Sequence, residues 1–275
     1  MLDGKADLHM HSTYSDGWLS PKQLVDKAAK AGLSVMSITD HDSVGGIEEA
    51  ASYAREMGIT IIPGIEMSAE VSGIEVHILG YFIDYKSEHL QKYLRHLREL
   101  RMDRGGMIVK KLNEMGSRIT LGTVLNHAGN DAAIGRPHIA KALKEEGFVG
   151  SFSEAFYKYI GDGKPAYVKK PNVSAKEAIE FISGSGGLSF VAHPGKYVTE
   201  EIFSELIHYG LDGIEIIHPS HKQEDIRNLS TTASQNFLLT SGGSDFHGGS
   251  RNDSKNFGAY YITSEEISNM KRRLI

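Results

Sequence analysis

The 275-residue chain contains no cysteine. Disulfide bonds and thiolate metal ligands are therefore excluded, and nothing indicates an oxidising compartment. The sequence also lacks a run of about 18 apolar residues, so no membrane-spanning helix is expected. The net charge is −5, which argues against the extensive basic surface that binds long nucleic acid. A short nucleotide is still compatible with this charge.

Two catalytic motifs are also missing. The chain has neither a GxSxG elbow for a serine nucleophile nor a GxxxxGK[ST] loop for nucleoside triphosphates. Acyl transfer and NTP-driven chemistry are therefore disfavoured. Because DLHMH begins within a few residues of the first methionine, we expect no signal peptide. The expected protein is cytoplasmic and binds no membrane.

Segments with strand and helix patterns alternate through most of the sequence, which is typical of βαβ units and a parallel sheet. The length fits one α/β barrel. Expected strands are residues 6–11, 34–39, 60–65, 76–83, 188–192, 213–217, 237–240 and 259–262. Expected helices are residues 20–31, 44–57, 175–183, 200–208 and 223–234, with a last helix that Ser264 caps.

One long stretch breaks this alternation. Residues 87–167 have a helical pattern throughout and contain no strand that ends in a metal-binding type of residue. We therefore expect residues 1–86 and 168–275 to form the barrel. Residues 87–167 would form a helical insertion over its C-terminal face, as a lid or substrate-binding subdomain.

Histidines and carboxylates recur where the expected strands end. In an α/β barrel these strand ends converge on the face that carries the chemistry. His9 and His11 are two residues apart on a strand, so both imidazoles are on the same face. Imidazole and oxygen ligands without thiolate suit Mn, Fe or Zn. The candidate metal ligands are His9, His11, Asp16, His41, Glu66, His77, His193, Asp245 and His247.

Several other polar residues are candidates for substrate binding or proton transfer. Arg136 of GRPH could hold a phosphate through two parallel hydrogen bonds, and the helix that starts at Pro137 also favours anions. A surface arginine before a helix explains Arg136 equally well. We expect substrate contacts from Arg136, His138, Lys196 and His221. Candidate catalytic residues are Asp40, His218 and His221, where geometry must decide which one protonates the leaving group.

The motifs together resemble a known family. DLHMHSTYSDG, TDHD, PGIE, VHILGY, AHPG and SDFHG follow the order of the motifs of the PHP (polymerase and histidinol phosphatase) metallo-phosphoesterases. GRPHIA and GIEIIHPSH are similar to its TrpH-like subgroup, which removes phosphate from small nucleotides, including 3′,5′-bisphosphates. The resemblance implies a distorted (β/α)7 barrel and three divalent metal ions.

The resemblance also implies how the ligands are shared among these ions. His9, His11, Glu66 and Asp245 would hold the first ion, and Asp16, His41 and His247 the second. His77 and His193 would hold the third, with Glu66 as a bridge to the first. Asp40 would orient an imidazole from behind the ligands.

Such a site predicts a phosphoesterase in which metal-activated hydroxide attacks a phosphate monoester of a small nucleotide. Alternative substrates are histidinol phosphate and the 5′ end of short RNA. Alternatives of another kind are a non-catalytic regulatory metal-binding module and an amidohydrolase. The amidohydrolase is disfavoured because no lysine stands at an expected strand end. The sequence leaves open which metal is native, which substrate is physiological and which oligomeric state forms.

Overall fold

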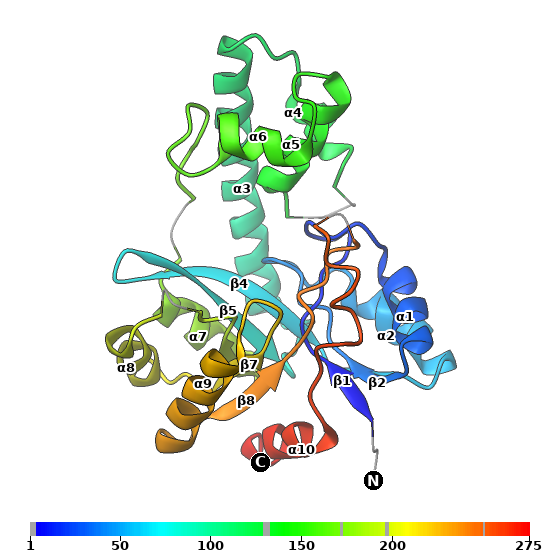
Figure 1. The fold of residues 1–275 in the computed structure, drawn as a ribbon, viewed down its shortest axis with the longest axis vertical. Coiled ribbons are helices and arrows are strands. Elements are labelled where there is room, and N and C mark those ends of the chain that lie inside the picture. The colour runs from blue at the N-terminus through cyan, green and yellow to red at the C-terminus, as the bar shows by residue number, and fades with distance from the viewer. Residues whose placement is uncertain (1–3, 129–132, 171–172, 196–197, 250) are drawn as a thin grey trace.

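The computed structural model describes residues 4–128, 133–170, 173–195, 198–249 and 251–275. Strands in these ranges form two sheets (Figure 1). The first sheet is parallel and consists of β1 (Lys5–Asp7), β2 (Leu33–Met36) and β3 (Thr60–Ile61). The second has the order β4 (Gly64–Val71), β5 (Ile74–Tyr81), β6 (Leu188–Val191), β7 (Gly213–Ile217) and β8 (Leu239–Gly242).

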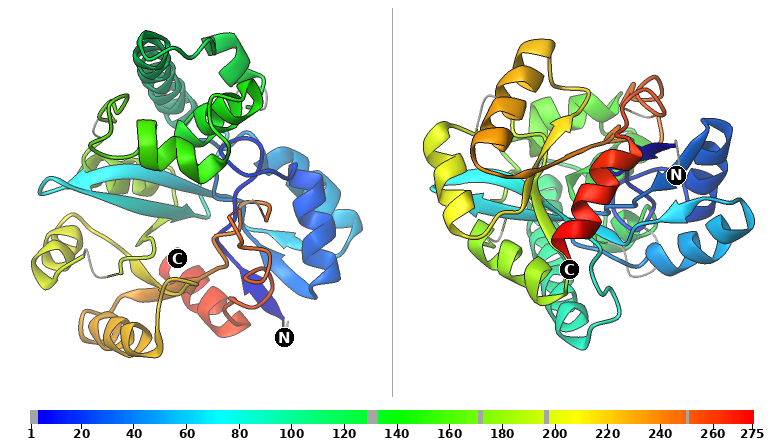
Figure 2. Two further views of the ribbon diagram at one scale, coloured as in Figure 1. Left: turned by 45° about the horizontal axis from the view of Figure 1, so that its top comes forward. Right: turned by 90° about the horizontal axis from the view of Figure 1, so that it is seen from below.

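The two sheets meet along both of their margins. His41, beyond β2, pairs with Glu66 of β4, and Met10, beyond β1, pairs with Phe246, beyond β8. These contacts bring strand ends from distant parts of the sequence to one region (Figure 2). The α/β class is confirmed. The described strands form no single closed sheet, so the closed seven-stranded barrel stays a prediction.

The expectation of a wholly parallel arrangement is wrong for the middle of the sheet. β4 pairs antiparallel with β5, and β5 pairs antiparallel with β6. Ser72 and Gly73 connect β4 to β5 with φ angles of 49° and 81°, and positive φ at both positions is typical of a two-residue hairpin with a type I′ turn. This local turn reverses the chain direction between β4 and β5, so the two strands cannot be parallel.

Two expected strands also differ in extent. The single strand expected at residues 60–65 is divided into β3 and β4, and Pro63 between them has no N–H to donate to a ladder. The strand expected at residues 259–262 is reduced to one antiparallel bridge between Ile262 and Ala6. Residues 251–258 before it form turns and bends instead, so this stretch has no length of extended chain to pair.

Helices cover the outer faces of the sheets, and most start at side chains that satisfy free backbone N–H groups. In α1 the Ser20 hydroxyl accepts a hydrogen bond from the Gln23 N–H, Pro21 takes the first position, and Gly32 follows the end with φ 72°. The last helix is capped by Thr263 and not by Ser264. The remaining bounds are α1 (Pro21–Lys30), α2 (Ile47–Glu56), α7 (Ala175–Gly184), α8 (Glu200–His208), α9 (Gln223–Gln235) and α10 (Ser264–Arg273).

Between β5 and α7 the described chain contains helices and no strand (Figure 1). Its elements are α3 (Glu88–Glu114), α4 (Leu121–Leu125), α5 (Arg136–Glu146), α6 (Phe152–Ala155) and the π-helix η1 (Phe156–Ile160). α3 contributes to two cores: Leu90 and Leu94 pack with β4 and α7, whereas Ile108 and Leu112 pack with α5. The helices α4–η1 therefore have a separate core that a continuous helix links to the sheets. No helix in the described ranges is both long and apolar enough to cross a membrane.

Candidate metal centre

The nine expected metal ligands come together at the strand ends. Each takes part in at least one group of three or four side chains whose ligand atoms lie within 4.8 Å of one another. These groups share members, so they form one continuous cluster. The groups that contain the nine are His11–Asp16–His41–His247, His9–Glu66–His193, His9–His11–Asp245 and His41–Glu66–His77.

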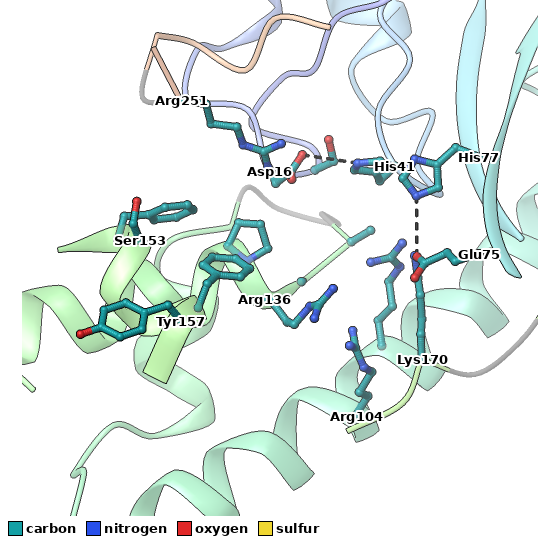
Figure 3. Close-up of a pocket in the computed structure, with 17 residues that line it drawn as sticks. Asp16, His41, Glu75, His77, Arg104, Arg136, Ser153, Tyr157, Lys170 and Arg251 are labelled. Atoms are coloured by element: carbon teal, nitrogen blue, oxygen red, sulfur yellow. Dashed lines mark hydrogen bonds and ion pairs between the residues drawn. The ribbon is translucent and has the colours of Figure 1, made fainter. Parts of the chain in front are cut away.

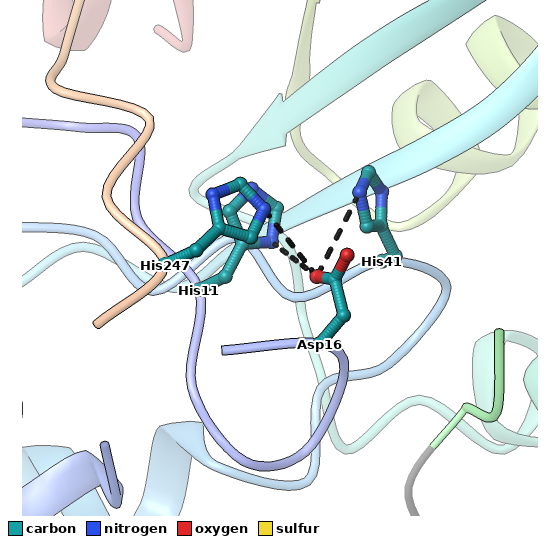
Figure 4. Close-up of side chains that lie close together, drawn as sticks. All are labelled: His11, Asp16, His41 and His247. Carbon is teal, nitrogen blue, oxygen red and sulfur yellow. Dashed lines mark ion pairs between the residues drawn. The ribbon is translucent and has the colours of Figure 1, made fainter. Parts of the chain in front are cut away.

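Asp16 is the common partner in the four-residue group (Figure 4). Its Oδ1 lies 3.4 Å from His247 Nε2, 3.9 Å from His11 Nδ1 and 4.0 Å from His41 Nε2. The His11 and His247 rings stack with centroids 4.1 Å apart. Burial by itself would raise the pKa of Asp16, but the facing His247 and His41 hold it well below its usual range. Asp16 is thus an anion, as a metal ligand must be.

Glu66 lies at the middle of the whole cluster. It comes from β4 and its side chain is only 1% exposed. Burial opposes its ionisation, yet the surrounding imidazoles hold its pKa well below the usual range. One carboxylate therefore lies within 3.5 Å of five imidazole nitrogens. Oε1 lies 2.9 Å from His77 Nδ1 and 3.1 Å from His193 Nε2, and Oε2 lies 3.0 Å from His41 Nδ1, 3.3 Å from His11 Nε2 and 3.5 Å from His9 Nε2.

The cluster has the properties expected of a cation site. Buried nitrogen and oxygen atoms are normally hydrogen-bonded, because an unpaired buried polar atom costs about 1–3 kcal/mol. Here several such atoms face one another without hydrogen-bond geometry, and a bound cation would satisfy them together. They are His9 Nε2, His11 Nε2, Asp16 Oδ1, His41 Nδ1, Glu66 Oε2, His218 Nε2 and His247 Nε2.

The backbone at two of these positions is strained. His193 and Asp245 have φ angles of 28° and 48°, which non-glycine residues seldom adopt. Next to Asp245, a Cβ on Gly243 would lie 2.4 Å from the His9 nitrogen. The glycine-rich segment before Asp245 therefore allows the chain to pack closely against the backbone at His9.

Glu215 is a site residue that the sequence analysis missed. It lies fully buried on β7, where Oε1 is 2.9 Å from His9 Nδ1 and Oε2 accepts a hydrogen bond from the His193 N–H at 2.7 Å. Burial would raise its pKa, but His9 and His218 keep it below its usual value. An acid within the apolar strand GIEII was the available signal, because an ionised carboxylate is seldom buried without a partner.

Asp40 is buried behind the cluster and holds a loop in place. Its carboxylate accepts hydrogen bonds from the Ser12 N–H at 2.7 Å and from the hydroxyls of Ser12 and Ser15. The Ser15 hydroxyl lies 3.5 Å from His11 Nδ1. Asp40 therefore reaches an imidazole only through Ser15 in the hydrogen bonds that the structure describes. A catalytic role for Asp40 stays a prediction.

The two candidate acid–base histidines differ in their positions. His218 Nε2 lies 3.4 Å from Asp245 Oδ2, and its ring centroid is 5.1 Å from that of His193. His221 stands one step further away, with its ring 5.4 Å from that of His218 and its Nδ1 2.8 Å from the Ile216 carbonyl oxygen. Thus His218 faces the cluster and His221 lies behind it.

The expected substrate-binding residues also separate. Arg136 begins α5 and lines the cavity beside the cluster, where it pairs with Asp162 and lies over the rings of Phe156 and Tyr167. His138 is buried, and its Nδ1 accepts the Gly135 N–H at 3.0 Å. Burial lowers the pKa of His138 to about 4, so it is neutral near pH 7. Lys196 lies outside the described residues.

A cavity of about 620 Å³ opens beside Asp16, His41 and His77. Figure 3 shows Arg104 and Arg136 facing these three residues across the cavity. The lining has two carboxylates, Asp16 and Glu75, and a larger number of cationic side chains. An anionic ligand therefore fits this cavity. The lining cations are Arg101, Arg104, Arg136, Lys170 and Arg251.

Most of these cations could not be assigned from the sequence. Arg101 is buried and its Nε donates to Asp42 Oδ2 at 2.9 Å, which ties α3 to the loop after His41. Lys170 lies 3.5 Å from Glu75, and burial, with repulsion by Arg101, lowers the pKa of Lys170 to about 8. Arg251 pairs with Asp16. Their contribution depends on the folding of α3 and two loops toward the strand ends.

Comparison with known proteins agrees with this geometry. Residues 7–188 match the family model described as the PHP domain. The 3′,5′-nucleoside bisphosphate phosphatase of Chromobacterium violaceum is 35% identical over 246 residues, covering 88% of this chain and 86% of that protein. The 5′-3′ exoribonuclease of Haemophilus influenzae is 35% identical over 249 residues, covering 88% and 90%.

Two crystal structures are also similar. A Bifidobacterium adolescentis protein proposed to be a metal-dependent phosphoesterase aligns with a TM-score of 0.90 and 32% identity, over 98% of this chain and 96% of that one. A Chromobacterium violaceum amidohydrolase with bound sulfate and no metal aligns with a TM-score of 0.84 and 32% identity, over 94% and 91%. From sequence and structure alike, this chain belongs to the PHP domain family.

Proposed function

We propose that this chain is a metal-dependent phosphatase that hydrolyses a phosphate monoester of a small nucleotide, such as a 3′,5′-bisphosphate. One observation carries the proposal. A buried cluster of imidazoles and carboxylates adjoins a 620 Å³ cavity whose lining has five cationic side chains. A phosphate group carries about −1.5 to −2 charges near pH 7, so a substrate with two phosphates matches both the cluster and the excess of cations.

We propose three divalent ions, Mn, Fe or Zn, at the cluster. His9, His11, Glu66 and Asp245 would hold the first, Asp16, His41 and His247 the second, and His77, His193 and Glu66 the third. When bound, such ions lower the pKa of water and neutralise charge on phosphoryl oxygens. The unpaired atoms of the cluster support this assignment because bound cations would give the buried imidazole and carboxylate atoms partners.

The chain's own residues would then have distinct tasks. Arg136 is proposed to clamp a substrate phosphate, since a guanidinium can bind two phosphate oxygens in parallel. Its pair with the exposed Asp162 is weak enough to exchange for a phosphate. His218 faces the cluster and is the better placed of the two histidines to give a proton to the leaving oxygen. Glu215 would fix the orientation of His9.

The relatives support the substrate class. One is named for its action on 3′,5′-nucleoside bisphosphates and another as an exoribonuclease. The sulfate in the Chromobacterium violaceum structure has the tetrahedral shape of a phosphate. The name of that structure also keeps the amidohydrolase alternative in view, but the described lining has one lysine, Lys170, and it is paired with Glu75.

The fold has a role in the same proposal. We propose that β1, β2 and β4–β8 form a distorted seven-stranded barrel. The bridges between His41 and Glu66 and between Met10 and Phe246 would close it. Residues 87–167 would be the lid and substrate-binding subdomain, since Arg101, Arg104 and Arg136 reach the cavity from α3 and α5. We make no proposal for the oligomeric state.

A substrate panel tests the function. The metal-loaded protein is assayed with 3′,5′-bisphosphates, nucleoside monophosphates, histidinol phosphate and short 5′-phosphorylated RNA, each with Mn, Fe and Zn. We expect the highest kcat/KM for the bisphosphates, because they engage the cluster and the cations together. The highest kcat/KM for histidinol phosphate would contradict the proposal.

A further inference from the structure

A second cavity, of about 470 Å³, lies beside the candidate metal centre. The loop between β1 and α1 separates the two: Asp16 lines the first cavity, and Gly17 and Trp18 line the second. The opposite wall comes from α5 and the residues after α4, and includes Lys141 and Lys144. We call this second cavity the Trp18 groove. The proposed function does not use it.

Trp18 presents a large aromatic surface in this groove. It is the only tryptophan of the chain, and its side chain is 46% exposed. The Lys141 ammonium lies 4.5 Å from the ring centroid, a cation–π distance. The backbone holds Trp18 in place, since its N–H donates to the His247 carbonyl oxygen at 3.0 Å. A Cβ on Gly248 would lie 2.6 Å from the Trp18 Cβ, so only glycine fits there.

The charge of the groove favours an anion. Lys144 is exposed, and Lys141 is partly buried beneath the indole. The lining has two lysines and one carboxylate, Glu145, whose Oε2 lies 3.3 Å from His127 Nε2. An aromatic platform flanked by lysines is the arrangement by which proteins bind single-stranded nucleic acid, with bases stacked on the ring and phosphates on the cations.

The groove adjoins the candidate metal centre. Trp18 is two residues from Asp16 and hydrogen-bonds the backbone of His247, and both of these residues belong to the cluster. Burial lowers the pKa of Lys141, and Asp16 is close enough for its charge to oppose that lowering. An oligonucleotide that extends from the first cavity past Asp16 would therefore reach the Trp18 groove.

We infer that the Trp18 groove binds the second nucleotide of a short single-stranded oligonucleotide whose phosphorylated end occupies the first cavity. This inference rests on the proposed function. Relatives are already named as 5′-3′ exoribonucleases, so what the inference adds is the place where the second nucleotide of such a substrate binds. The second base stacks on Trp18, and its phosphate lies near Lys141 and Lys144. The groove adds binding energy and no chemical step.

The single tryptophan allows a direct test of binding. The metal-loaded protein is titrated with 5′-phosphorothioate mono-, di- and trinucleotides while its intrinsic fluorescence is followed. We expect the di- and trinucleotide to quench the fluorescence and to bind more tightly than the mononucleotide. Equal affinity for all three lengths, or no quenching by the dinucleotide, overturns the inference. This readout needs no turnover, so it stands apart from a failure of the proposed activity.

Variants test the same groove through kinetics. Trp18→Leu should lower kcat/KM for a 5′-phosphorylated dinucleotide by about 5- to 150-fold, the value of one lost base stack. Its kcat/KM for a 3′,5′-bisphosphate should not change. Trp18→Phe should restore most of the loss. A matched control is Tyr261→Leu, which removes another exposed ring that has a lysine, Lys5, 4.6 Å from its centroid.

The kinetic outcomes separate the two proposals. If Trp18→Leu lowers kcat/KM equally for the dinucleotide and the bisphosphate, or for neither, the groove has no such role although the phosphatase stands. Lys144→Ala should weaken dinucleotide binding and reduce its dependence on salt, because one phosphate contact is lost. An unchanged salt dependence in Lys144→Ala would likewise count against the groove.

Discussion

His9 Nδ1 lies 2.9 Å from Glu215 Oε1, although 206 positions separate the two residues in the sequence. This contact leaves His9 Nε2 as the nitrogen that faces Glu66 and Asp245. A carboxylate behind a histidine fixes the ring orientation and the position of its proton. The contact therefore determines which atom of His9 is presented to the cluster.

Replacement of Glu215 should weaken metal binding without removing a proposed ligand. In Glu215→Gln the side-chain volume is kept but the charge behind His9 is lost. We expect about a 10- to 100-fold loss of metal affinity, measured by competition with a chelator. Glu180→Gln, on the exposed face of α7, is the control and should bind metal normally. Unchanged affinity in Glu215→Gln would show that His9 needs no such support.

Glu66 should be required for both metal content and activity. Its two oxygens face five imidazoles, so Glu66→Ala leaves adjacent cations without a shared anion. We expect reduced metal stoichiometry by elemental analysis and loss of turnover, with circular dichroism reporting a folded chain. Glu70→Ala, on the same strand and paired with Lys169, provides the comparison. Full metal content with normal turnover in Glu66→Ala would contradict the bridging role.

Arg136 should contribute to substrate recognition. Loss of a charge-assisted contact from a water-poor site costs on the order of 2–4 kcal/mol, so Arg136→Ala should lower kcat/KM by roughly 30- to 1000-fold. Arg136→Lys should retain only part of the wild-type kcat/KM, because an ammonium cannot form the two parallel hydrogen bonds of a guanidinium. Asp162→Ala removes the competing carboxylate and should not slow the reaction. Wild-type kinetics in Arg136→Ala would leave α5 without a role in phosphate binding.

The buried pair between Arg101 and Asp42 should stabilise the chain. Arg101→Met removes the charge but keeps much of the volume, and leaves the Asp42 carboxylate buried without its main partner. Loss of one member of a buried pair costs about 3–5 kcal/mol. Urea unfolding of the metal-free protein measures this. Lys86→Met breaks the exposed pair with Glu48 and should leave the unfolding midpoint unchanged; an equal midpoint in both variants would refute the prediction.

Local patterns were sufficient for much of the site. Strand ends and period-two spacing predicted that His9 and His11 share a face, and the structure places both against Glu66. The same local reasoning failed at β4 and β5. The antiparallel pairing of β4 and β5 depends on a turn of only two residues, Ser72 and Gly73. So short a turn is easily missed in a sequence that otherwise alternates between strand and helix patterns.

By itself, the sequence determined the α/β class, the family and the residues that gather at the strand ends, because each of these depends on neighbours only a few positions apart. The tertiary structure alone decided that Glu215 lies behind His9, that Arg101, Lys170 and Arg251 border the cavity, and that Trp18 faces Lys141. These relationships join residues that are 120 or more positions apart, such as Trp18 and Lys141, or belong to different elements. Burial and charge compensation are properties of such distant neighbours, so no local pattern contains them.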